Sequence, residues 1–154
     1  MEIKVEAVAP EVTYPLRHRV LRPYLTFEEM KPQAGELDPG AVHLAAVTPD
    51  GEVVGTAVLF REPFAHLPGR VDAWRLRGVA VADGLRGHGI GAEILARVLG
   101  HVAEQGGGLL WCNARVPARR FYERAGFSVV GDEWEAPHTG PHVTMWRAVT
   151  ADGD

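Results

Sequence analysis

The sequence predicts a single α/β domain over residues 1–154, with one mixed sheet of about seven strands and helices on both of its faces. Three observations lead to this fold class. Strand-like and helical segments alternate in the order β-α-β-β-β-α-β-α-β-β. The length is typical of one domain. No internal repeat or low-complexity stretch marks a second one.

The first third of the chain predicts a strand, a helix and a loop. Residues 3–8 alternate apolar and polar side chains, which favours a half-buried strand. Residues 10–22 suit a helix with Val12, Leu16, Val20 and Leu21 on one side. Three prolines and two glycines in 23–40 predict a loop, with a short helix near 26–30.

The middle of the chain predicts a β-hairpin followed by a further strand. Two apolar runs, 42–47 and 53–60, flank the turn sequence Thr-Pro-Asp-Gly-Glu. Residues 62–70 form a loop, and an apolar run then leads to a strand that ends at Val81. This strand directly precedes a glycine-rich turn.

The last third alternates helix and strand. A helix runs from the glycine-rich turn to about residue 105, where three successive glycines end it. Residues 109–113 are an apolar strand of the central-sheet type. A short helix over 117–125 has proline in its first turn. Strands at 127–130 and 143–149 follow, separated by a loop that contains proline, glycine and histidine.

Composition limits the partners and the compartment. The formal net charge of −4 argues against nucleic acid as a partner. The single cysteine, Cys112, lies in an apolar run and indicates a buried thiol in a reducing compartment. No signal peptide and no apolar run of membrane-spanning length is present, so we expect a cytoplasmic protein without a membrane partner.

The glycine-rich turn has the composition of a phosphate site. It comprises Arg86, Gly87, His88, Gly89, Ile90 and Gly91, between a strand and an amphipathic helix. Backbone N–H groups at a helix start lack intrahelical acceptors, and the helix dipole adds partial positive charge there. Glycines allow a ligand to approach the backbone closely, and Arg86 adds a full charge. The turn therefore predicts a pyrophosphate-bearing ligand.

A dinucleotide-binding turn is the first alternative for this segment. That fingerprint requires Gly-x-Gly-x-x-Gly after the first strand of a βαβ unit, with an acidic residue about 20 positions later. Here the second spacing is one residue short, and antiparallel strands precede the turn. The pattern disfavours this alternative.

Three segments together resemble the GNAT acetyltransferase superfamily. The turn resembles its Arg/Gln-x-x-Gly-x-Gly/Ala motif for the acetyl-CoA pyrophosphate. Residues 118–127, Ala-Arg-Arg-Phe-Tyr-Glu-Arg-Ala-Gly-Phe, are similar to the family's Ala-x-x-Phe/Leu-Tyr-Glu-Lys-x-Gly-Phe segment. Residues 140–145 resemble the last strand of a bacterial branch. The resemblance covers the chain from about residue 53 to its end.

The resemblance implies the fold and the cosubstrate. The implied fold is a twisted, mostly antiparallel sheet whose fourth and fifth strands splay apart. The cosubstrate would be acetyl-CoA, with its pantetheine arm along the backbone of Val79, Ala80 and Val81. Its pyrophosphate would bind the N–H groups of 87–91. The resemblance leaves a homodimer open, because dimers are common among such enzymes.

Arg115 departs from the family pattern. Many relatives carry Asn or Gln seven residues before the tyrosine, whereas this chain has Arg115 there and Asn113 two residues earlier. The arginine could bind a cofactor phosphate or an anionic group of the acceptor. Both assignments stay open.

Tyr122 is the expected general acid. Acetyl transfer needs a neutral amine, a donor to the oxyanion and a proton for the departing thiolate. A backbone N–H near Val79 or Val81 could be the oxyanion donor. We expect the helix start and nearby arginines to lower the pKa of Tyr122. From composition alone a packed structural tyrosine is the commoner case, and the resemblance favours the acid.

The general base is open between several side chains and a water chain. The side-chain candidates are Glu52, Asp72, Glu133, Glu135, His138 and His142. His138 and His142 have a metal-like spacing, but proline and glycine between them exclude a helix and no third ligand is apparent, so no metal is expected. Arg17 and Arg22 favour a solvated helix face, with an anionic acceptor as the alternative.

The expected activity is transfer of acetyl from acetyl-CoA to a primary amine of a small molecule or peptide. Transfer would be direct within a ternary complex, because no residue has the surroundings of an activated nucleophile. Two alternatives remain: a non-catalytic acyl-CoA sensor or scaffold of the same fold, and an enzyme that transfers a longer acyl group.

Overall fold

The computed structural model describes residues 2–152, which form seven strands, three α-helices and two short 3-10 helices. The strands are β1 (Lys4–Ala7), β2 (Val42–Val47), β3 (Val53–Arg61), β4 (Ala73–Val81), β5 (Gly108–Arg115), β6 (Ser128–Ala136) and β7 (Gly140–Val149). The helices are α1 (Pro10–Leu21), η1 (Phe27–Glu29), α2 (Ile90–Glu104), η2 (Val116–Ala118) and α3 (Arg119–Arg124). Among these residues no helix is long and apolar enough to cross a membrane.

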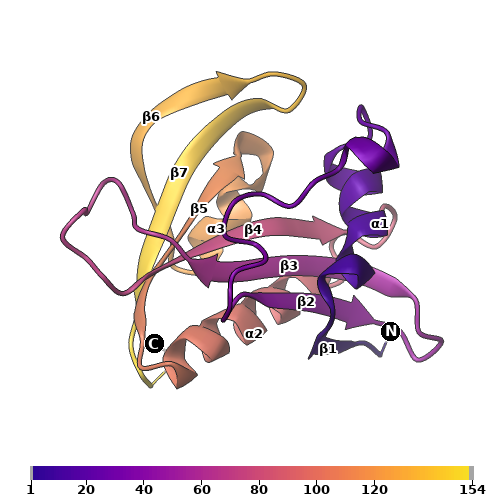
Figure 1. Ribbon diagram of the computed structural model, residues 1–154, viewed down its shortest axis with the longest axis horizontal. Helices are drawn as coiled ribbons and strands as arrows, with labels where there is room; N and C mark the ends of the chain where they lie inside the picture. Colours follow the sequence, from indigo (N-terminus) through magenta and orange to yellow (C-terminus); the bar gives the residue numbers. More distant parts are fainter. Residues whose placement is uncertain (1, 153–154) are drawn as a thin grey trace. The chain divides into compact units, whose positions relative to one another are not determined.

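The strands form one mixed sheet in the order β1-β2-β3-β4-β5-β7-β6 (Figure 1). β1–β2, β2–β3, β5–β7 and β6–β7 pair antiparallel, and β4–β5 pair in parallel. The predicted mixed, mostly antiparallel sheet of seven strands is therefore confirmed. The β4–β5 register runs from Ala73↔Leu109 to Arg75↔Trp111. A splay of these two strands stays a prediction.

Contacts divide the chain into two compact units. The first comprises Met1–Phe60 and Leu76–Val98, and the second comprises Arg61–Arg75 and Leu99–Asp154. β4 and α2 each contribute residues to both units. The expected single domain over 1–154 stays a prediction.

In the first unit, α2 packs closely against the β2–β3 hairpin. Leu44 and Val54 are buried on the hairpin, and Ile90 and Ile94 are buried on the first turns of α2. A Cβ added to Gly55 would lie 2.5 Å from the Ile94 Cδ1 and 2.9 Å from the Ile90 Cγ2. Only glycine allows this approach, which fixes where the helix begins relative to β3.

The buried face of α1 differs from the predicted one. The buried residues of the helix are Thr13, Leu16 and Arg17, whereas Val12 is 40% exposed. Of the predicted apolar stripe, Leu16 is buried and Val12 is not, because two polar side chains occupy the buried face. Thr13 donates its hydroxyl to the Pro10 carbonyl at 2.8 Å, and Arg17 pairs with a buried carboxylate.

In the second unit an aromatic cluster fills the core. Phe64, Ala73, Leu109 and Trp111 are buried together, and Trp146 and Val130 pack against them. The Trp111 indole N–H donates to the Glu62 carbonyl at 3.1 Å. The Arg75 guanidinium lies 4.7 Å from the centre of the Trp111 ring, and it also pairs with the Glu62 carboxylate at 2.9 Å. Glu62 thus accepts from both the Trp111 indole and the Arg75 guanidinium, through its carbonyl and its carboxylate.

The predicted loop between the last two strands is mostly strand. β6 extends to Ala136 and β7 begins at Gly140, so the turn spans only residues 137–139. Trp134 faces His142 across the pair, with stacked rings 5.5 Å apart. The sequence indicated the turn residues correctly. It did not indicate the Trp134–His142 contact, which accompanies strand pairing on both sides of the turn.

The glycine run between α2 and β5 supplies a test of packing. Gly108 has φ +152°, and a Cβ there would lie 2.3 Å from the Asp72 carbonyl oxygen. Gly108→Ala should lower the free energy of unfolding by at least about 2 kcal/mol, because strain and overlap act together. Urea denaturation measures this. The control is Gly100→Ala within α2, where a Cβ meets nothing within 4 Å; it should raise stability by ~0.5–1 kcal/mol.

Candidate functional site

The glycine-rich turn is anchored at its start to β3. Ala82 is buried and donates its N–H to the Val54 carbonyl at 2.9 Å, and the Leu85 N–H donates back to Ala82 at 3.1 Å. Gly84, Gly87 and Gly89 have φ values of +84°, +86° and +80°. Positive φ at three positions curls the backbone tightly before α2, a conformation that other residues rarely adopt.

The tip of this turn is exposed and has room for a ligand. Residues 86–89 are exposed, whereas Ile90 is buried and fixes the start of the helix. A Cβ added to Gly87 or Gly89 would meet nothing within 4 Å. The first N–H groups of a helix have no acceptor within the helix. At the start of α2, the Glu93 N–H donates to the Gly89 carbonyl at 3.0 Å. The local geometry therefore fits a phosphate.

The positive charge of Arg86 is paired with a carboxylate. Its guanidinium lies 3.2 Å from the Asp83 carboxylate, and both side chains are largely exposed. An exposed pair of this kind contributes little to stability and exchanges partners readily. His88, the neighbouring candidate, is also exposed.

The end of β4 carries the other predicted cofactor contacts. Ala80 is buried, and Val79 and Val81 are half-buried on either side of it. Gly78, directly before them, has φ +60° within the strand. Its carbonyl accepts a hydrogen bond from the Thr56 hydroxyl at 2.8 Å. The three predicted residues and the glycine-rich turn thus lie in the same unit.

Tyr122 is buried in an aromatic cluster of the second unit. The residue is 6% exposed, and its ring meets Phe121 and Phe127 edge-on at 5.0 Å and 5.4 Å. Burial raises the pKa of Tyr122 well above its usual value, and the neighbouring Cys112 thiol raises it further. The predicted lowering of this pKa was wrong. Arg119, which opens α3, pairs with Glu123 at 3.2 Å, and desolvation of the phenolate dominates.

Arg115 and Asn113 lie at the end of β5, opposite β7. Arg115 is half-buried and faces His142 in the register, and the Asn113 side-chain oxygen accepts from the Thr144 hydroxyl at 2.9 Å. The His142 Nδ1 lies 2.8 Å from the Gly140 carbonyl. Asn113 is thus already hydrogen-bonded within the sheet, and the role of Arg115 stays open.

The candidate bases differ in their surroundings. Asp72 is held by two Arg70 hydrogen bonds of 2.8 Å, which lower its pKa. Glu133 and Glu135 are exposed on β6, and Glu52 is exposed in the hairpin turn. His138 lies in the β6–β7 turn with φ +67°. Within residues 2–152 no group of three His, Cys, Asp or Glu side chains could hold a metal ion.

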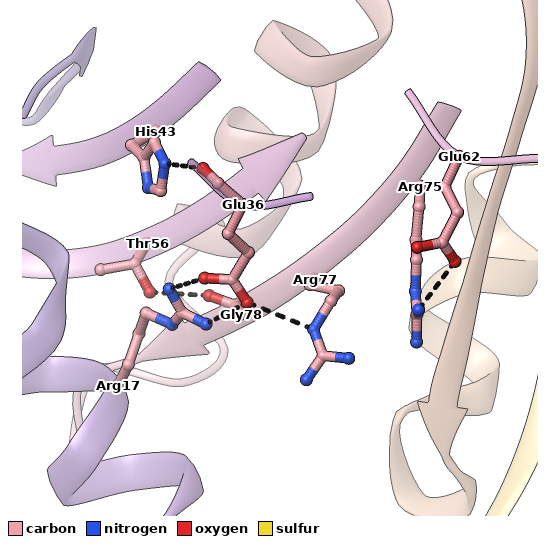
Figure 2. A network of polar contacts seen from close by, with 8 residues as sticks. All are labelled: Arg17, Glu36, His43, Thr56, Glu62, Arg75, Arg77 and Gly78. Carbon is pink, nitrogen blue, oxygen red and sulfur yellow. Dashed lines mark hydrogen bonds and ion pairs between the residues drawn. The ribbon is translucent and has the colours of Figure 1, made fainter. Parts of the chain in front are cut away.

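Glu36 is a buried carboxylate that the sequence analysis missed. It is 0% exposed and accepts two hydrogen bonds from Arg17, at 2.9 Å and 3.1 Å (Figure 2). Arg77 of β4 adds a contact of 3.4 Å. The prediction of a solvated Arg17 was therefore wrong. Glu36 lies in the irregular segment before β2, where no periodicity signals burial.

The comparisons with known proteins match this fold and this turn. The family model described as the acetyltransferase (GNAT) family matches residues 10–127. The protein named Uncharacterized N-acetyltransferase YitI of Bacillus subtilis is 31% identical over 147 residues, which cover 96% of this chain and 97% of that protein. The chain belongs to the GNAT acetyltransferase family. It is therefore an acyltransferase, and GNAT enzymes use acyl-CoA.

Solved structures of other proteins share the fold at low sequence identity. Escherichia coli ElaA aligns with a TM-score of 0.75 at 18% identity, covering 95% of this chain and 99% of that one. An aminoglycoside 6'-N-acetyltransferase complexed with coenzyme A aligns with a TM-score of 0.69 at 16% identity, covering 95% and 97%. At these identities the likeness concerns the GNAT fold alone.

Cys112 supplies a test of burial by alkaline pH. Burial raises the pKa of its thiol to about 12. The unfolded chain loses this proton near pH 9 and the folded chain keeps it, so rising pH favours unfolding above pH 9. The free energy of unfolding should fall by ~1.4 kcal/mol per pH unit for this group.

Urea unfolding from pH 8 to pH 11 measures that slope in the wild type and in Cys112→Ala, and the slope reaches its full value about one unit above pH 9. The free energy of unfolding of the variant should fall less steeply with pH, because the proton of the Cys112 thiol no longer contributes. Equal slopes in the two proteins would contradict a buried, protonated thiol.

Proposed function

We propose that this enzyme transfers an acetyl group from acetyl-CoA to a primary amine of a small molecule or peptide, directly within a ternary complex. The observation that carries the proposal is the exposed turn before α2, where Gly87 and Gly89 keep positive φ beside open space. Family membership supplies the acyl-CoA, and the anion-binding geometry of the turn agrees with it.

Two elements of the first unit would supply the backbone contacts to the cosubstrate. The backbone N–H groups of 87–91 would bind the pyrophosphate, with Arg86 released from Asp83 to add charge. The backbone of Val79, Ala80 and Val81 would pair with the pantetheine arm as a further strand does. A backbone N–H of this strand would donate to the oxyanion. Arg115 would bind a phosphate or an anionic group of the acceptor.

Tyr122 would donate the proton that the departing thiolate requires. The amine nitrogen bonds to the carbonyl carbon, the carbon–sulfur bond breaks, and the sulfur takes the phenolic proton. The phenol regains a proton from the nitrogen, directly or through water. The raised pKa keeps Tyr122 protonated throughout the neutral range, so its hydroxyl is always a donor. It also makes a lasting phenolate unfavourable.

Direct transfer is favoured over a covalent acyl-enzyme. Cys112, the only cysteine of the sequence, is buried and has a pKa of about 12. A thiol of that pKa is almost entirely protonated at neutral pH and is a poor nucleophile. A sequence with one cysteine, and that one buried, also fits a reducing compartment, and we propose the cytoplasm as the location of this enzyme.

Calorimetric titration with acetyl-CoA, with NADH as the control ligand, tests the proposal. Micromolar binding of acetyl-CoA without binding of NADH is expected. Gly89→Ala should weaken acetyl-CoA binding at least about tenfold, because a methyl group enters the space for the anion and the backbone relaxes from positive φ.

Gly84→Ala is the matched control for this variant. Gly84 has φ +84°, close to the +80° of Gly89, and a Cβ at either position meets nothing within 4 Å. The two substitutions therefore introduce similar strain, and only Gly89→Ala should reduce affinity. Equal losses in both variants, or intact affinity in Gly89→Ala, would contradict the phosphate assignment.

Tyr122→Phe tests the proton donor. The substitution removes only the hydroxyl, so the ring contacts with Phe121 and Phe127 remain. We expect kcat for thiol release to fall about 10²–10⁴-fold, the usual contribution of a positioned general acid. The affinity for acetyl-CoA should stay within twofold by calorimetry. Unchanged turnover with an accepted amine would exclude Tyr122 as the acid.

A further inference from the structure

The peptide between Gly78 and Val79 is held in one orientation by a side chain. The Thr56 hydroxyl, on the buried Thr56 of β3, donates to the Gly78 carbonyl at 2.8 Å (Figure 2). The peptide is trans, so its N–H and C=O groups point in opposite directions. Holding the carbonyl toward Thr56 therefore directs the Val79 N–H away from Thr56.

This peptide needs a restraint from outside its own residues. Gly78 has φ +60° and no side chain, so rotation about its bonds meets little steric resistance. A peptide next to such a glycine can turn over when its carbonyl has no fixed donor. The Thr56 hydroxyl supplies that donor from the neighbouring strand.

Arg17 closes the space around the same glycine. A Cβ at Gly78 would lie 2.7 Å from the Arg17 Nε and 2.9 Å from its Cζ, so the guanidinium lies directly against the Gly78 Cα. Glu36 fixes that guanidinium through both of its oxygens and also contacts Arg77, the residue before Gly78. The backbone at Gly78 is thus bounded by Thr56 and by the Arg17–Glu36 pair.

The segment that carries Glu36 is held by two further contacts. Its carbonyl lies 2.7 Å from the His43 Nε2, on β2. Gly35, with φ +95°, lies so close to the Phe60 ring that a Cβ would be 2.6 Å away. The carboxylate therefore belongs to a segment that is docked on the hairpin and does not adjust freely.

We propose that Thr56 is a positioning residue for acyl transfer: it orients the Val79 N–H, which donates to the oxygen of the reacting thioester carbonyl. The inference rests on the proposed function, since it assigns the oxyanion donor of that reaction to one peptide. Arg17 and Glu36 act with Thr56 by confining the Gly78 backbone. None of the three side chains needs to touch the acyl group.

Amide NMR tests the orientation without knowledge of the acceptor. In the wild type, the Val79 amide signal should differ between the acetyl-CoA and the CoA complexes, because only acetyl-CoA carries the thioester carbonyl. Thr56→Val, which replaces the hydroxyl by a methyl group of similar volume, should remove that difference. Thr56→Ser should restore it.

Thr13→Val is the matched control. Thr13 is 1% exposed and donates its hydroxyl to the Pro10 carbonyl at 2.8 Å, so the same type of hydrogen bond is lost in the same unit. The Val79 difference should survive this substitution. With an amine that supports thiol release, Thr56→Val should lower kcat at least tenfold and leave the KM for acetyl-CoA within twofold, and Thr13→Val should change neither.

The outcomes separate this inference from the proposed function. If the wild type does not bind acetyl-CoA, both are overturned. If it binds acetyl-CoA but the Val79 signal is the same with acetyl-CoA and with CoA, or if Thr56→Val keeps the difference, the positioning role alone is overturned. A loss of the Val79 difference in both Thr56→Val and Thr13→Val indicates general destabilisation and also overturns it.

Discussion

The buried carboxylate of Glu36 is the constraint on which the first unit depends. It has no exposed surface and accepts hydrogen bonds from Arg17 of α1, and it also contacts Arg77 of β4. A buried ion pair adds little net stability compared with apolar packing, but loss of one partner costs about 3–5 kcal/mol, since the other charge stays buried. The interaction therefore selects one arrangement of α1, the segment around Glu36 and β4. It also places the Arg17 guanidinium against Gly78.

Burial, more than charge, governs the chemistry of the second unit. Burial is the main cause of the raised pKa of both Tyr122 and Cys112, and the Cys112 thiol raises the pKa of Tyr122 further. The arginines near Tyr122 in sequence do not lower its pKa: Arg119 pairs with Glu123, and burial of the phenol dominates. The same burial that keeps Cys112 inert keeps the phenol neutral. The proposed direct transfer would use such a neutral phenol as its proton donor, with an inert thiol beside it.

The sequence predicted the regular elements and missed the contacts that fix them. Alternation, the Pro-Asp-Gly turn and the triple glycine gave all seven strands, because each signal is local. The β6–β7 extension was missed because the Trp134–His142 stack joins residues on two strands. Arg17 and Glu36 were missed for a similar reason. Arginine on a short helix indicates a solvated face, and its partner lies 19 residues later in a segment without periodicity.

The conformation of the glycine-rich turn could be predicted from sequence because it depends on the glycines themselves. Gly87 and Gly89 are recognisable because no other residue combines positive φ with an open approach to N–H groups. Gly78 has the same conformational freedom but the opposite surroundings, since Arg17 fills the space where a side chain would lie. An open glycine admits a ligand to the backbone, whereas an enclosed glycine lets neighbouring side chains set the direction of a peptide. The motif identifies the first kind, and the second kind emerges only when Thr56, Arg17 and Glu36 are seen around it.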